Sequence, residues 1–225
     1  MTPYSYCLRF DDGAGPNPYW GVCTLAICKP AIRRMARKGD WVLGVGSKNA
    51  PRLGNISGDM VYAMKVTRVM SMQEYDEFCR ESLPGKIPDW TNSDFRRRVG
   101  DCIYDFDSGY KPLLRRSVHT ERNRRRDLSG RNVLLSTHFY YFGDEPESLP
   151  KRLLPLAHPT QGHKSHANDS YINDFVRWIE NGGWRRNMIV GEPQLKDKIL
   201  SMTKQECRSL CSEQHREEDE HDAVC

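Results

Sequence analysis

Stretches of alternating apolar and polar residues recur along the chain and determine its predicted secondary structure. They span residues 4–10, 21–27, 40–47, 59–70 and 132–143. A period of two places every second side chain on the same face, which is typical of a half-buried strand. Residues 59–70 and 132–143 are the richest in β-branched and aromatic side chains, so each is predicted to form one long strand.

Helical periodicity occurs in shorter blocks between these strands. Pro30 suits the first turn of a short basic helix. Residues 71–82 begin with Ser71 and Glu74, whose spacing is that of a capping box. The apolar positions of residues 168–183 fall on one helical stripe, which predicts a helix packed against the core.

The order of these elements predicts an α+β domain. Strands do not alternate regularly with crossover helices, and no G-x-G-x-x-G opens a helix after a strand, which argues against a doubly wound sheet. We expect a small, mostly antiparallel β-barrel with flanking helices. Residues 84–131 are predicted to be long loops with short structured pieces. We assign residues 1–191 to this domain and 192–225 to a C-terminal polar helix, over 194–215, and an acidic tail.

Charge is distributed unevenly along the chain. The net charge is +4, but residues 205–225 carry seven acids against two arginines, so the tail is −5 and the remainder is +9. Residues 94–131 contain eleven Lys and Arg against six acids. Such clustering suits the phosphates of a nucleotide or nucleic acid, which are the predicted partner of this long basic insert. A solvated loop without a ligand explains the same run equally well.

Cysteine usage and hydropathy suggest a cytoplasmic protein. The eight cysteines lack the dense framework of a small secreted scaffold, and no basic-then-apolar leader precedes them, so they are interpreted mostly as thiols in a reducing compartment. No apolar run approaches the length that crosses a bilayer, so no membrane contact is expected. The pattern leaves the oligomeric state open.

Unusual residue types are concentrated in the predicted loop between the first two strands. Asp11 and Asp12 follow a strand, and either can contact a ligand, act as a general base or hydrogen-bond the turn backbone. Asn17 next to Tyr19 combines an amide with an aromatic face, which suits an unstacked base. An aromatic side chain that only caps the barrel is the alternative.

The residues that follow this loop carry cations and a cysteine at the predicted helix start. Lys29 and Arg33 with the backbone N–H groups there predict an anion site. Cys28 is a candidate nucleophile at the same place, although buried cysteines are more often inert packing residues. Catalytic candidates are therefore Asp11, Asp12 and Cys28.

Further candidate contacts lie in two later segments. Trp41 is expected in the core or against a base, and Ser47 and Lys48 follow glycines that permit either close ligand approach or a barrel bend. His163 lies in a His- and Lys-containing loop that suits phosphate contact. The spacing of Cys207, Cys211 and His215 does not match that of a typical zinc site, so no metal and no cofactor is predicted.

Five sequence blocks together resemble a known family. In order they are "CLRFDDGAGPNPYWGVCTLAICKPAIRRMARKGDWVLGVGSK", "VYAMKVTRVMSMQEY", "DCIYDFDSG", "STHFYYFG" and "GHKSH". They are similar to the blocks of the Nmad2 family, the second nucleotide modification associated domain, over roughly residues 4–190. Matching positions include Asp11, Asn17, Cys28, Lys29, Arg33, Trp41, Ser47 and His163. The segment from the basic helix to "YAMKVTRV" also resembles PUA-like barrels such as the EVE and ASCH domains.

The resemblance implies a context of nucleotide modification or defence against phage, and it implies no particular reaction. Our leading hypothesis is binding of a modified nucleotide or nucleic-acid base in a pocket between the loop at 11–20 and the strand at 44–48. The alternative hypothesis is an enzyme that modifies or cleaves such a nucleotide, with Asp11 or Asp12 as general base. A third hypothesis is a protein-interaction module whose acidic tail competes for its own basic face.

Overall fold

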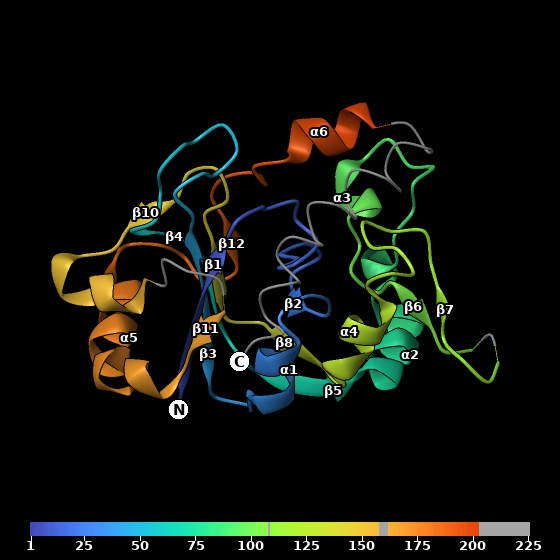
Figure 1. Cartoon of the computed structure of the whole chain (residues 1–225), viewed down its shortest axis with the longest axis horizontal. Coiled ribbons are helices and arrows are strands. Elements are labelled where there is room, and N and C mark those ends of the chain that lie inside the picture. Colours follow the sequence, from blue (N-terminus) through green and yellow to red (C-terminus); the bar gives the residue numbers. More distant parts are fainter. Residues whose placement is uncertain (108, 158–161, 203–225) are drawn as a thin grey trace.

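The computed structural model describes residues 1–107, 109–157 and 162–202, and these form two stacked sheets flanked by helices (Figure 1). The larger sheet has the order β11-β1-β3-β4-β9-β12, with β10 paired to β4. Its strands are β1 (Pro3–Leu8), β3 (Trp41–Gly46), β4 (Asp59–Lys65), β9 (Phe139–Tyr141), β10 (Glu147–Ser148), β11 (His163–Lys164) and β12 (Met188–Ile189). Pairing is antiparallel except for the parallel pairs β1–β3 and β9–β12.

The smaller sheet is antiparallel and has the order β2-β8-β5. Its strands are β2 (Cys23–Leu25), β5 (Arg68–Ser71) and β8 (Asn132–Ser136). A two-stranded ribbon, β6 (Tyr104–Asp105) with β7 (Leu113–Leu114), lies within the predicted long insert. The first two predicted strands therefore do not pair with each other, because each belongs to a different sheet.

Two predicted strands are each divided between the sheets. The stretch 59–70 forms β4 and then β5, and the stretch 132–143 forms β8 and then β9. The Thr67 amide donates to Leu135 O at 2.9 Å, and the Ser136 hydroxyl donates to carbonyl oxygens on both sides of the corner. Hydrogen bonding thus continues through a bend that no Gly or Pro marks in the sequence.

The helices lie around the two sheets. They are α1 (Pro30–Met35), α2 (Met72–Ser82), α3 (Phe95–Arg98), α4 (Arg124–Ser129), α5 (Ile172–Asn181) and α6 (Lys196–Ser201), with 3-10 turns η1 (Pro84–Lys86), η2 (Lys151–Leu156) and η3 (His166–Tyr171). Helix α5 packs on the larger sheet, α2 packs on the smaller one, and Ile32 of α1 lies in the layer between them. The predicted capping box of α2 is confirmed, since Ser71 and Glu74 bond each other's backbone amides. Of the predicted helix 194–215, the structure describes α6 only, and the tail lies outside the described residues.

Three apolar layers follow from this arrangement. One lies between α5 and the larger sheet, where Trp41 and Phe175 meet. A second lies between the two sheets and includes Tyr6, Tyr62 and Leu25. A third includes residues of the smaller sheet together with Tyr75 of α2 and Phe95 of α3, and Figure 1 shows α2 beside this sheet.

The fold is of the predicted α+β class, but the predicted barrel is not found. Among the described strands neither sheet closes on itself, because the larger sheet ends at β11 and β12 and the smaller at β2 and β5. The bent strands β4–β5 and β8–β9 connect the sheets along one side only. Within the described ranges, no helix combines the length and apolar character needed to cross a membrane.

A buried lysine ties the Asp-containing loop to the insert. The Lys86 ammonium lies 2.6 to 2.8 Å from four oxygen atoms, which belong to Asn17, Val22 and Thr24. Thr24 in turn donates its hydroxyl to Asp101 at 2.5 Å. Burial lowers the pKa of Lys86, and the Asp101 carboxylate opposes that change. This charged network holds the loop in place from inside the molecule.

Replacing the ammonium is expected to destabilise the whole domain. Lys86→Met leaves Asp101 and the oxygen atoms around the ammonium buried without their cation, and breaking such a pair costs about 3 to 5 kcal/mol. Urea unfolding measures the change. The matched control, Lys151→Met at an exposed site, should change stability by less than about 0.5 kcal/mol. Equal effects of the two substitutions would contradict this role for Lys86.

Candidate functional site

Cys28 lies on a tight turn between a strand and a helix. The chain leaves β2 at Leu25, and α1 begins at Pro30. Cys28 and Lys29 both adopt the left-handed conformation, with φ of 58° and 40°. For residues other than glycine, this conformation costs about 1 to 2 kcal/mol each and tends to persist at functional sites.

The side chains of His119 and Asp127 continue a line of polar contacts that starts at the Cys28 sulfur. His119 Nε2 lies 3.6 Å from Cys28 Sγ, and His119 Nδ1 lies 2.7 Å from Asp127 Oδ2. Tyr104 donates its hydroxyl to the same carboxylate oxygen at 2.9 Å. A thiol, an imidazole and a carboxylate in this order form the arrangement in which histidine activates a cysteine and an acid orients the histidine.

The electrostatics favour a protonated imidazole at this position. Burial lowers the pKa of His119, but the charges of Asp127 and Cys28 outweigh it and raise the value to about 10. Burial also raises the pKa of Asp127, and the charges of His119 and Arg33 reverse this, leaving it below its usual value. The protonated imidazole therefore places a positive charge 3.6 Å from the Cys28 sulfur.

Arg33 fastens the cysteine turn to the helix that carries the carboxylate. Its fully buried guanidinium donates to the carbonyl oxygens of Cys28 at 2.9 Å and Ala26 at 2.7 Å. It also donates to those of Asn132 at 3.0 Å and Asp127 at 2.5 Å. Arg33, which the sequence predicted to hold an external anion, thus uses its guanidinium to bind carbonyl oxygens inside the protein.

The Asp-containing loop packs directly on this site. A Cβ added at Gly15 would lie in van der Waals contact with Cys28 Sγ, at 3.5 Å, and Ala14 of the same loop belongs to one buried apolar cluster with Cys28. The carboxylates of Asp11 and Asp12 each accept a backbone amide of their own turn. Tyr141 from β9 also donates its hydroxyl to Asp11 at 2.6 Å.

Asp11 is a buried carboxyl with an unusual proton affinity. Burial raises its pKa, the Tyr141 hydrogen bond lowers it and the Asp12 charge raises it, to about 7 overall. Asp11 can therefore exchange a proton near neutral pH, and the buried Tyr19 hydroxyl in the same loop has no hydrogen-bond partner among the described residues.

The other predicted contacts are dispersed through the fold. The Lys29 ammonium lies over the Tyr6 ring, 4.8 Å from its centroid. The Asn17 amide is buried, donating to Val99 O and accepting from Lys86. His163 pairs with β1, and its ring lies 6.4 Å from that of Tyr4. Positions of the remaining candidates are as follows: Trp41 is buried against α5, Ser47 is buried after β3, and Lys48 is exposed.

The space created by the glycines of β3 is filled by neighbouring side chains. A Cβ at Gly44 would lie 2.4 Å from the Tyr62 ring, and one at Gly46 would lie 2.4 Å from Ile56. These glycines therefore permit close packing between β3 and its neighbours. The pocket predicted between the loop at 11–20 and this strand remains a prediction.

Sequence reasoning missed His119 and Asp127. Both lie within the arginine-rich insert, which was interpreted only as a basic surface for phosphates. His119 is 91 residues from Cys28 along the chain, and no fixed spacing links such partners before the fold brings them together. A lone histidine in a basic stretch was the only available signal.

Many cations of that insert are engaged within the molecule. Arg96 pairs with Asp94 at 2.7 Å, and Arg115 pairs with Asp76 at 2.7 Å. Arg124 bonds Glu121. The predicted phosphate contacts of this insert thus compete with internal ion pairs. Among the described residues, no group of three or more His, Cys, Asp and Glu side chains could hold a metal ion.

The fold and site define an α+β protein with a buried cysteine, histidine and aspartate in line. The family model of Nmad2, nucleotide modification associated domain 2, matches residues 1–200. The chain therefore belongs to the Nmad2 family, as its sequence blocks predicted. Searches of curated proteins and of solved structures found no match.

The raised pKa of Asp11 predicts a pH-dependent loss of stability. The folded state binds this proton more tightly than the unfolded chain, so its stabilising effect is lost as the pH rises from about 4 to about 7. Asp11→Asn removes the titration. Relative to wild type, the variant should gain roughly 4 kcal/mol of unfolding free energy between pH 4 and pH 8.

Urea unfolding at a series of pH values tests this expectation. Asp169→Asn, at an exposed carboxylate, is the control and should parallel wild type. A difference between wild type and Asp11→Asn that stays constant with pH would show that Asp11 is ionised normally in the fold.

Proposed function

We propose that this protein is a thiol enzyme of nucleotide modification, with Cys28 as the nucleophile and an acyl group carried by a nucleotide as the substrate. The observation that supports this most is the line from Cys28 through His119 to Asp127, at 3.6 Å and 2.7 Å. Membership of the Nmad2 family supports the nucleotide context. The proposal develops the enzymatic alternative of the sequence analysis. Cys28 acts as nucleophile, and His119 takes the place of an aspartate as general acid and base.

The chemistry follows from the three groups. The Cys28 sulfur attacks the acyl carbon, forming a C–S bond, and the bond from that carbon to the leaving nitrogen or oxygen breaks. His119 gives its proton to the leaving group. Water then attacks the thioester while His119 accepts its proton, and the C–S bond breaks, which releases the carboxylic acid and restores the Cys28 thiolate next to protonated His119. Asp127 stays ionised and holds the imidazole in position throughout.

Neighbouring groups suit the charges that this reaction develops. Lys29 follows the nucleophile directly and carries a cation next to the Tyr6 ring. A buried cation close to the reacting carbon would stabilise an oxyanion or a substrate phosphate. Asp11, with a pKa of about 7, would supply or accept a hydrogen bond to the base. The modified nucleotide or base of the leading hypothesis would thus be held by this loop next to the cysteine turn.

A generic acyl donor tests the nucleophile without knowledge of the natural substrate. We expect p-nitrophenyl acetate to acetylate wild-type protein at Cys28, as located by peptide mass spectrometry. Cys28→Ser should abolish the adduct at this position. His119→Gln should slow its formation about 10²- to 10⁴-fold, because the proton-transfer group is lost.

The control is Cys7→Ser, since Cys7 is a second buried thiol, outside the line of three groups. This variant should react like wild type. Circular dichroism and thermal unfolding establish that each variant is folded. Acetylation at Cys28 that proceeds equally fast in His119→Gln would overturn the proposal, as would a folded wild-type protein that is never acetylated there.

A further inference from the structure

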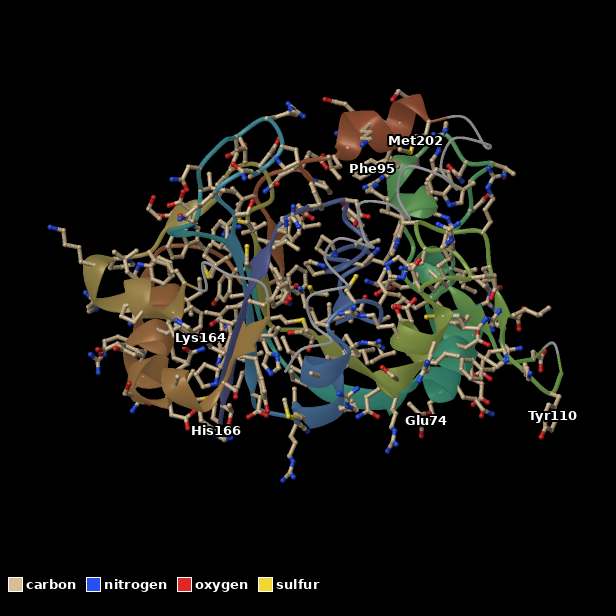
Figure 2. The ribbon with its side chains drawn as sticks, viewed as in Figure 1. Glu74, Phe95, Tyr110, Lys164, His166 and Met202 are labelled. Carbon is tan, nitrogen blue, oxygen red and sulfur yellow. The ribbon has the colours of Figure 1, made fainter. Side chains whose placement is uncertain are left out.

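A basic groove lies on the other side of α1 from Cys28. It has a volume of about 1040 Å³ and is lined by α1 and the residues after it, by the start of β1, by β5 and by His166. Figure 2 places His166 at the same edge of the molecule as the start of the chain. None of the predicted nucleotide contacts lines this groove.

The charged groups of the groove are mostly positive. Arg34, Arg37, Lys38 and Arg68 line it, and all four are exposed. Asp40 is the only acid among the described residues of the lining, and its oxygens accept the backbone amides of Thr2 and Arg37. The carboxylate is therefore engaged with the groove's own backbone, while the four cations face solvent. A surface of this kind attracts a polyanion.

Two of the cations are held in fixed positions. Arg34 donates to the carbonyl oxygen of Ser129 at 3.0 Å. The Arg68 guanidinium lies over the Phe78 ring, 5.4 Å from its centroid. Fixed cations lose less side-chain entropy when they contact a phosphate than freely rotating ones do. Arg34 and Arg68 thus provide a preorganised part of the binding surface.

The lining between the cations is partly apolar and aromatic. Met35, Val69 and Tyr4 contribute carbon surface, and Met35 is 45% exposed. Surfaces that bind single strands combine cations that follow the backbone with apolar or aromatic groups that receive unstacked bases. A small anion would need only the cations. The combination therefore favours a nucleic-acid strand over inorganic phosphate.

The groove is directly connected to the cysteine site. Arg33, which bonds Cys28, and Arg34, which lines the groove, are neighbours on α1. Asn132 also belongs to both places, since it lines the groove and exchanges hydrogen bonds with Arg33. A strand bound in the groove would therefore lie one helix away from the nucleophile.

We infer that this groove binds the sugar-phosphate backbone of single-stranded DNA and so presents a polymer, rather than a free nucleotide, to the protein. The choice of a single strand rests on the proposed function, because a base must leave its stack before chemistry can be done on it. The assignment of the groove as a polyanion surface rests on its lining alone.

Fluorescence anisotropy with a labelled single-stranded 20-nucleotide DNA tests the inference on the full chain. We expect salt-sensitive binding by wild type. The double variant Arg37→Gln/Lys38→Gln should bind at least about tenfold more weakly at low salt, and its slope of log K against log salt should be shallower by about 1.4, as expected for two lost phosphate contacts.

The matched control is Lys151→Gln/Arg152→Gln, which removes two adjacent exposed cations outside the groove. It should bind DNA like wild type apart from a small uniform decrease. Equal binding by the two double variants would overturn the inference. Duplex DNA that binds as tightly as the single strand would overturn the choice of strand, and displacement by polyaspartate as effective as by unlabelled DNA would assign the groove to an acidic peptide instead.

Acetylation of Cys28 by p-nitrophenyl acetate separates this inference from the proposed function. Arg37 and Lys38 do not contact the line of groups from Cys28 to Asp127, so the groove variant should be acetylated at the wild-type rate. Loss of DNA binding with unchanged acetylation in the groove variant supports DNA binding in the groove. Wild-type protein that binds DNA but is not acetylated would overturn the proposed thiol enzyme and leave DNA binding in the groove intact.

Discussion

The buried guanidinium of Arg33 is the interaction on which the rest of the site depends. It satisfies carbonyl oxygens of the cysteine turn and of α4 and β8, whose acceptors Asp127 and Asn132 lie 94 and 99 residues further along the chain than Arg33. Gly130 is required next to it, because a Cβ there would lie 2.3 Å from the guanidinium carbon. Removing this cation would leave several buried carbonyl groups unpaired, each at a cost of about 1 to 3 kcal/mol.

The same cation connects packing to chemistry. Its charge helps to keep Asp127 ionised, and ionised Asp127 helps to keep His119 protonated next to the thiol. The cysteine turn itself is held in a left-handed conformation that its residue types do not favour. Strain in the turn is tolerated because the guanidinium bonds two of its carbonyl groups. A rigid support of this kind is what a nucleophile and its acid–base partner need to keep their geometry.

Local sequence signals predicted local structure well. The capping box at Ser71 and Glu74 and the strands that became β1, β2 and β3 depend on neighbouring residues, and they are present. The bends that divide 59–70 and 132–143 were missed because neither corner contains a Gly or Pro to mark it. The closed barrel was expected from strand order, which does not specify whether the end strands meet.

The site was predicted only in part, for the same physical reason. The loop at Asp11 and the turn at Cys28 were found because unusual residues are adjacent in sequence, and the structure brings them into contact. Arg33 was interpreted as an anion-binding residue because the sequence shows neither that its guanidinium is buried nor that Asp127 and Asn132, from a distant segment, supply carbonyl partners for it. His119 and Asp127 acquire their relation to Cys28 through tertiary folding alone, so no pattern in the chain marks them.

The protonation state of His119 tests the account most directly. Nitrogen NMR of the imidazole in labelled protein reports whether both ring nitrogens carry protons as the pH is raised. We predict that wild-type His119 remains an imidazolium through neutral pH and titrates near pH 10, and that Asp127→Asn lowers this value. A neutral His119 at pH 7 in folded wild-type protein would contradict it.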